Sequence, residues 1–278
     1  AFVQQYSSNV QMLSQQMGSL LRDTVDVETI TGDKAFFEQV GQAAAAAKTS
    51  RHADTPLMNT PHSRRMVTLT DYEYADLIDD QDKLRMLISP ESTYARAAAA
   101  AIGRSMDDVI IAAMGGTALT GTTGSTSTTL PSAQKIAHGS AGLTIAKLVT
   151  AKKKLDEKSV DPSIPRYIVV SPEQIEDLLN STTVTSADFN TVKALVQGDI
   201  DTFVGFKFIT SNRLTDDGTS RLCYAWAQDG MKLAIGKEPN AKIDERSDKS
   251  YATQVYYCSS FGSTRMEEEK VVEIACNE

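Results

Sequence analysis

The chain has 278 residues, and its 41% hydrophobic and 23% charged residues are typical of a globular protein rather than a disordered one. Its formal net charge of −8 argues against a dedicated nucleic-acid-binding protein, which would normally carry a basic field. No run approaches the roughly 20 apolar residues of a membrane helix, and the sequence does not open with the charged-then-apolar pattern of a secretion signal. We therefore expect a soluble, unexported protein with no membrane partner.

The leading segment, about 75 residues long, contains little apolar sequence. Residues 1–40 show only weak helical spacing, and residues 48–65 form a polar stretch that contains Pro56 and Pro61. Residues 66–74 are rich in β-branched and aromatic residues, which predicts a strand that returns from a long hairpin. Extended edges aggregate unless a partner covers them. The segment is therefore either a flexible tail with a loop or, as we favour, an arm and hairpin that must pack on neighbouring copies.

A long helix is predicted next. Ser89-Pro90-Glu91 combines a capping residue, a proline suited to the first helical position and an acid near the positive end of the dipole, and Gly115-Gly116 ends the pattern. Such a helix would be roughly 35 Å long, and its Ala-rich centre, residues 97–101, permits close approach of another element. Apolar or small residues that recur at steps of three and four define its expected stripe: Tyr94, Ala98, Ile102, Ser105, Val109 and Ala112.

The second half of the chain predicts a compact α/β lobe followed by two long strands. Residues 117–132 form either a loop or a loosely paired hairpin, and a helix that includes Leu148, Ala151 and Leu155 on its buried side follows. Ser171-Pro172-Glu173 opens another helix. The lobe strands are Tyr167–Val170, Val204–Ile209, Leu222–Ala227 and Met231–Ile235, with Pro239 as the exit, and the long strands are Tyr251–Cys258 and Lys270–Ile274.

The three cysteines, Cys223, Cys258 and Cys276, stand far apart and form no Cys-x-x-Cys pair. Their number is odd, and their neighbours are apolar or small. This pattern predicts buried free thiols in a reducing compartment rather than a disulfide framework.

No group of residues predicts catalysis. His52, His62 and His138 are expected in loops without a cysteine or acid at diagnostic spacing, so no metal site is predicted. Ser140 does not lie in a Gly-x-Ser-x-Gly nucleophile motif, and Thr122 stands where a phosphate-binding loop requires lysine. We therefore predict no catalytic, cofactor-binding or metal-binding residues and no cofactor.

The order of these parts, together with three stretches near the end of the chain, resembles the major capsid proteins of tailed bacteriophages. The stretches are Met231–Gly236, Asp244–Ser250 and the Gly-x-x-Arg turn at Phe261–Met266 with its terminal strand. The resemblance implies an α+β, Hong Kong 97-type fold, which encapsulins share. Its expected parts are an N-terminal arm (1–40), an extended hairpin loop (41–75), a peripheral domain (76–158 and 241–278) with a spine helix at about 90–114, and an axial domain (159–240).

The resemblance also implies a function. The chain would be a structural subunit whose pentamers and hexamers form an icosahedral head around double-stranded DNA, without sequence-specific binding, in the virion capsid. Assembly would take place in the bacterial host cytoplasm, as a precursor shell that expands on DNA packaging. Partners would be many copies of itself, a separate scaffolding protein (unless a segment is removed before Ala1), a portal and decoration proteins. The loop Ser181–Thr191 would lie at the capsomer centre.

Candidate intersubunit contacts follow from this interpretation, and for each one simple solubility or local packing is the alternative. They are Phe2 and Tyr6 on the arm, and Arg51, Arg64, Arg65, Tyr72 and Tyr74 on the hairpin. Two other functions remain open. One is an encapsulin-type nanocompartment shell, and the other is a soluble enzyme or binding domain whose arm is disordered.

Overall fold

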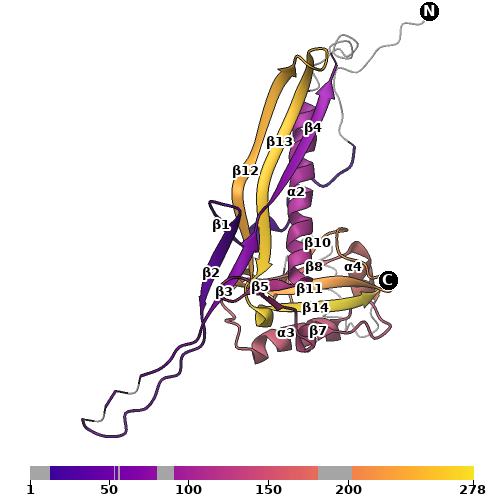
Figure 1. Ribbon diagram of the computed structural model, residues 1–278. Coiled ribbons are helices and arrows are strands. Elements are labelled where there is room, and N and C mark those ends of the chain that lie inside the picture. Colours follow the sequence, from indigo (N-terminus) through magenta and orange to yellow (C-terminus); the bar gives the residue numbers. More distant parts are fainter. Residues whose placement is uncertain (1–12, 53, 56, 80–90, 181–201) are drawn as a thin grey trace, which may run out of the picture.

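A computed structural model describes residues 13–52, 54, 55, 57–79, 91–180 and 202–278. Figure 1 shows a long sheet that lies along one helix, a compact lobe at one end of that helix, and a narrow loop that extends away from the body. The expected helix cap at Ser89-Pro90, the loop Ser181–Thr191, and the arm residues Phe2 and Tyr6 lie outside the described residues.

The long sheet has the strand order β1-β12-β13-β4, in which only the β1–β12 pair is parallel. The expected lobe strand Met231–Ile235 is instead the start of β12, which pairs with β13. A run of alternating residues predicts a strand but not the sheet it joins, so this assignment was wrong. The bounds are β1 Asp26–Thr29, β12 Met231–Arg246, β13 Ala252–Arg265 and β4 Thr70–Ile78.

Pro239 was expected to mark the exit from the lobe. It lies instead within β12. The pairing with β13 shifts in register between Lys237 and Asn240, on either side of it. In the described chain β1 covers β12 only as far as Ile235, so Pro239 stands on an open edge. A proline has no N–H to donate, and an edge with an irregular register is where a strand tolerates one.

Helix α2, Glu91–Gly115, agrees with the predicted spine helix. Its buried side differs from the expected stripe, because Val109 is only half-buried and Ala112 is exposed. Steps of four bring two methionines into the core instead, and this row consists of Ala98, Ile102, Met106, Ile110 and Met114. The close approach of another element occurs beside the Ala-rich centre, at Gly103, where a Cβ would lie 2.5 Å from the carbonyl carbon of Gly18.

The described part of the arm packs on its own chain. The backbone N–H groups of Leu20 and Leu21 donate to the buried carboxylate of Asp107 at 3.0 and 3.1 Å. The side chains of Leu21 and Val25 join the main core, and the indole of Trp226 donates to the Thr24 carbonyl at 3.0 Å. The expectation that the whole leading segment depends on neighbouring copies was therefore wrong for residues 16–25.

The lobe is built on a sheet of order β7-β14-β11-β8-β10-β9. Its strands are β7 Lys135–Ile136, β14 Val271–Asn277, β11 Ser220–Ala227, β8 Arg166–Val170, β10 Phe206–Thr210 and β9 Thr202–Phe203. Helices α3 Ile145–Glu157 and α4 Pro172–Asn180 accompany it. The strands Tyr167–Val170 and Leu222–Ala227 are confirmed. The terminal strand was assigned to the other domain, but β14 lies between β7 and β11, and α3 packs against it.

A third sheet, of order β2-β3-β5-β6, forms the base of the extended hairpin. Its bounds are β2 Lys34–Val40, β3 His62–Thr68, β5 Ala118–Thr120 and β6 Thr126–Thr128. The hairpin therefore begins at Lys34, and the expected boundary at residue 40 cuts it. Residues 117–132 form a paired hairpin, the second of the two alternatives.

One continuous hydrophobic core joins the long helix to the lobe. It includes Ile110 and Met114 of α2, Leu148 of α3, and Trp226 and Ile274 of the lobe sheet. All three cysteines are buried and free, as predicted. The described chain also has 3-10 turns at η1 Arg22–Thr24, η2 Ser132–Gln134, η3 Gln228–Gly230 and η4 Glu268–Lys270.

Candidate assembly site: the extended loop and its anchor

The extended loop, residues 41–61, connects β2 to β3, and in Figure 1 its described part extends away from the other labelled elements. None of its described residues is buried, and the side chain of Leu57 is 95% exposed. Met58 and, at the base of the loop, Val40 are exposed as well. The loop therefore exposes apolar side chains away from the core of its own subunit.

Arg65 anchors the base of the loop. It lies on β3, and only 7% of it is exposed. Its Nη2 donates to Oε2 of Glu268 at 2.6 Å, and its Nε donates to the Met266 carbonyl at 2.8 Å, which also accepts a hydrogen bond from Gln39 on β2 at 2.6 Å. Both strands of the hairpin are thereby fixed to the turn that connects β13 and β14.

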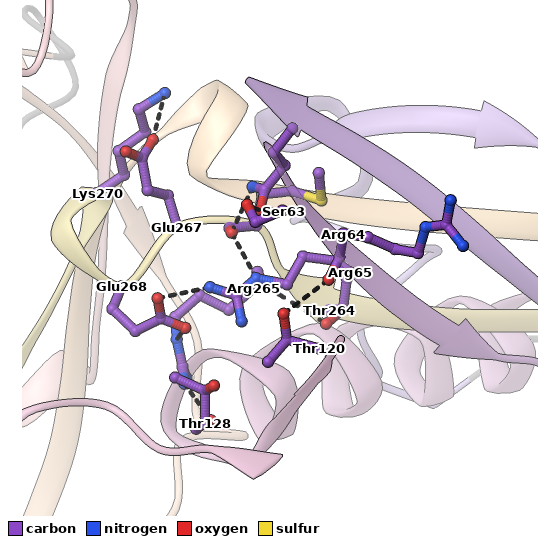
Figure 2. Close-up of polar contacts among 12 residues, drawn as sticks. Ser63, Arg64, Arg65, Thr120, Thr128, Thr264, Arg265, Glu267, Glu268 and Lys270 are labelled. Atoms are coloured by element: carbon purple, nitrogen blue, oxygen red, sulfur yellow. Dashed lines mark hydrogen bonds and ion pairs between the residues drawn. The ribbon is translucent and has the colours of Figure 1, made fainter. Parts of the chain in front are cut away.

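Arg265 lies beside this contact and is fully buried (Figure 2). Its Nη1 donates to the carbonyls of Met114 and Gly116 at 2.8 and 2.9 Å, and its Nη2 to the Thr128 carbonyl at 3.2 Å. The last turn of α2 has no basic residue of its own. Arg265 therefore supplies the cation that the negative end of the helix dipole favours, and it satisfies carbonyls that the helix leaves free.

Glu268 joins the two arginines into one junction cluster (Arg65, Arg265 and Glu268). Its Oε2 accepts from Arg65, and its Oε1 lies 3.6 Å from Nε of Arg265. Burial lowers the pKa of the Arg265 guanidinium, whereas the Glu268 carboxylate acts in the opposite direction. The cluster therefore ties the loop base, the end of α2 and the β13–β14 turn together, so it determines the direction in which the extended loop points.

The sequence-predicted contact residues divide into two groups. Arg65 is buried and bonded to Met266 and Glu268, which favours an internal anchoring role, and its contact with a neighbouring copy stays a prediction. Tyr72 stacks on Phe261 with ring centroids 4.4 Å apart, which also favours local packing for that residue. Arg51 lies on the extended loop and is exposed, with no partner among the described residues.

Arg64 and Tyr74 have partners but remain partly accessible. Arg64 forms an ion pair with Glu38, donates to the Thr122 carbonyl at 3.2 Å and lies over the ring of Phe36. The hydroxyl of Tyr74 donates to Asp76 at 3.4 Å. Burial, followed by the nearby Asp76 charge, raises the pKa of Tyr74, which therefore stays protonated at neutral pH.

Sequence reasoning missed the roles of Arg265 and Glu268. Both residues lie in stretches that carried a signal, the Gly-x-x-Arg turn and the acidic run at residues 267–269. The partner of Glu268, Arg65, is about 200 positions away in the sequence, and no local pattern shows that pairing.

The described residues contain neither a cluster of three or more His, Cys, Asp or Glu side chains suited to a metal ion nor a helix long and apolar enough to span a membrane. His52 and His62 are exposed, and Nδ1 of His138 accepts a hydrogen bond from the backbone N–H of Ser140 at 3.1 Å.

Comparison with solved structures shows the same fold in phage capsids. The chain resembles the capsid of cyanophage P-SCSP1u with 17% identity and a TM-score of 0.76, covering 100% of this chain and 93% of that one. It resembles the capsid of Ralstonia phage GP4 with 10% identity and a TM-score of 0.79, covering 99% and 95%. For Mycobacterium phage Che8 the identity is 17%, the TM-score 0.70 and the coverage 99% and 97%. The expected α+β, Hong Kong 97-type fold is thereby confirmed.

Sequence comparison gives the family. No curated protein matches the chain. The model of the family described as "Phage capsid protein" matches residues 1–278, which is the whole sequence. The chain therefore belongs to the phage capsid protein family and is a major capsid subunit of the virion, with a structural role.

Proposed function

We propose that the chain forms pentamers and hexamers, and that the extended loop of each subunit laps over an adjacent subunit to join them into an icosahedral head. One observation carries this proposal. The extended loop places Leu57 and Met58 in solvent, while the junction cluster holds its base rigidly. A loop that is fixed at its base and exposes apolar residues on its returning limb is suited to contact another copy rather than its own core.

Many such contacts would act together. Each would be modest, but a subunit that touches several neighbours at once gains affinity through multivalency. Arg51 on the extended loop remains a proposed contact, as do Arg64, Tyr74 and the arm residues Phe2 and Tyr6. Expansion of a precursor shell would move the extended loop relative to α2, and the hinge would lie beyond the base that the junction cluster holds.

The remaining partners are proposed from the family. They are a separate scaffolding protein, a portal and decoration proteins, with assembly in the cytoplasm of the bacterial host. The head would enclose double-stranded DNA without gripping it, since a net charge of −8 gives the subunit little general attraction for phosphates. Measurable binding of isolated subunits to random DNA at moderate salt would contradict this part of the proposal.

Family membership favours a phage head over an encapsulin-type nanocompartment and over a soluble enzyme. The direct experiment is electron microscopy of the purified protein, produced with and without the proposed scaffolding protein. Uniform closed particles in either preparation support the proposal. Persistent monomers in both, at concentrations at which other capsid subunits assemble, would overturn it.

A further inference from the structure

A pocket with unpaired positive charge lies at the end of the lobe sheet where β8 and β10 begin. It has a volume of about 460 Å³. We call its three cationic residues, Lys152, Arg166 and Lys207, the basic pocket. Neither lysine forms an ion pair or hydrogen bond within the part of the chain that the structure describes, although the other lysines nearby on α3 do. Lys153, for example, pairs with Glu157 at 3.4 Å.

Arg166 is held in place at the inner wall of this pocket. Only 8% of it is exposed. Its Nη1 pairs with Asp156 at 2.7 Å, and its Nη2 donates to the Val160 carbonyl at 2.9 Å, while its buried Nε has no hydrogen-bond partner in the described chain. Asp156 is the acid that lines the pocket, and Arg166 engages it. The two lysine charges are therefore not compensated, and the pocket is suited to carboxylates.

A matching acidic surface lies at the opposite end of β8. Helix α4 follows the last residue of that strand, and we call Glu173, Glu176 and Asp177 its acidic face. Glu173 and Glu176 are exposed and lie three positions apart, on neighbouring parts of the helix surface. None of the three forms an ion pair within the described residues. Burial, together with the charges of Glu176 and Glu278, raises the pKa of Asp177, and the charge of Lys147 opposes this shift only in part.

Subunits in a ring meet through heterologous contacts, in which one patch of each copy binds a different patch of the next. A chain that forms such rings needs two complementary patches on separate sides, and the lobe has them at the two ends of one strand. We propose that the acidic face of one copy docks on the basic pocket of the next copy around each capsomer. This inference rests on the proposed assembly into pentamers and hexamers, and it identifies residues that hold them together.

The test reverses each patch separately and then both together. Lys152→Glu with Lys207→Glu, and Glu173→Lys with Glu176→Lys, should each raise the subunit concentration for half-maximal assembly at least about tenfold, because attraction becomes repulsion. The variant that carries all four changes should recover most of the loss. Lys153→Glu, next along α3, is the matched control and should assemble like the wild type. High salt should weaken wild-type assembly and narrow these differences.

Mixing the two double variants gives a sharper result. One variant then has two acidic patches and the other two basic ones, so every favourable contact joins unlike subunits. Such subunits can alternate around a ring of six but not around a ring of five. Co-expression should therefore yield hexamers and open sheets or tubes, with few closed particles, as seen by electron microscopy and native mass spectrometry.

Several outcomes would overturn the inference. Normal assembly of both double variants would do so. The variant with all four changes would also do so if its assembly did not recover although its thermal unfolding midpoint matched that of the wild type. Closed heads of the lysine variant that package less DNA would assign the pocket to nucleic acid instead. If the wild type itself forms no particles, the proposed function fails first. In that case, weak self-association through the two patches can still be measured by chemical crosslinking of Lys207 in one copy to Glu176 in another. The absence of this crosslink would reject the proposed contact.

Discussion

Arg265 shows how one side chain can serve three elements. It belongs to β13, and it donates to carbonyls at the end of α2. It also lies beside Glu268, which accepts a hydrogen bond from Arg65 on β3. The planar guanidinium makes this possible because it donates in several fixed directions, which a lysine cannot do. The charge of Glu268 is the common element of the cluster, so its removal is the most informative change.

Glu268→Gln should lower the free energy of unfolding of the subunit by about 3–5 kcal/mol, because it leaves two buried guanidinium groups without a counter-charge. Urea unfolding of assembly-incompetent subunits measures this. Glu267→Gln is the matched control, since that acid pairs with Lys270 at the surface and should contribute no more than about 1 kcal/mol. Equal effects of the two changes would show that the junction cluster is not a structural anchor.

The cysteines should be unreactive in the folded subunit. All three are buried, which keeps a reagent away from each sulfur. The hydrogen bond between Cys223 and Cys276 raises the pKa of the Cys223 thiol and lowers that of Cys276, so burial rather than pKa protects Cys276. A thiol reagent at neutral pH should therefore modify none of them before unfolding and all three afterwards. Labelling followed by mass spectrometry checks this, and rapid modification of a folded subunit would contradict the described burial.

At the scale of single residues, the sequence predicted whether a side chain is buried better than it predicted which residue that side chain contacts. The burial of the cysteines follows from their apolar neighbours, and it is confirmed. Arg65 was predicted to contact a neighbouring copy, and its internal ion pair with Glu268, about 200 positions later, could not be read from any local pattern. Spacing rules describe neighbours within one element and cannot supply such long-range pairs.

The extended loop is the element whose removal separates folding from assembly. Replacement of residues 42–60 by Asn-Gly keeps the hydrogen bond from the Gly41 N–H to the Pro61 carbonyl. The free energy of unfolding should change by no more than about 2 kcal/mol, because no described loop residue is buried and closure entropy depends weakly on length. Closed particles should be lost. Denaturation and electron microscopy give the two measurements, and a shell built from loopless subunits would refute the lapping role.

The arm depends on Asp107. Asp107→Asn should release residues 16–21, because the carboxylate accepts from two backbone N–H groups that an amide nitrogen would repel. Tryptic cleavage after Arg22 should become at least about tenfold faster in limited proteolysis. Asp108→Asn is the control: that side chain is partly exposed and pairs with Arg213, so the arm should stay protected. Unchanged protection in Asp107→Asn would mean that apolar contacts alone hold the arm.

Element types were largely predictable, whereas their partners were not. The long helix was recognised from its cap and its terminal glycines, and the strands from their runs of β-branched and aromatic residues. The sheet that each strand joins depends on contacts across the whole chain. Met231–Ile235 was therefore assigned to the lobe although it belongs to the long sheet, and the terminal strand was assigned to the peripheral domain although it belongs to the lobe sheet. Pro239 contributed to this error, since an open edge accommodates a residue that usually ends a strand.

For the whole molecule, a shared core implies that the lobe and the long sheet unfold together. The core passes from α2 into the lobe without a break. Trp226, the single tryptophan, reports on the lobe, while far-ultraviolet circular dichroism reports on every helix and strand. In urea, both signals from assembly-incompetent subunits should give one midpoint. Two midpoints would show that the bodies are independent domains.

The position of β14 has a consequence for synthesis. This strand leaves the ribosome after every other strand described, yet it lies inside the lobe sheet, between β7 and β11. Arg265 and Glu268, which fix the loop base, are also made late. A nascent chain therefore cannot complete the lobe or set the loop angle until translation of these residues is finished. A chain without these residues could neither complete the lobe sheet nor fix the loop base, so under the proposed function it should not enter the head.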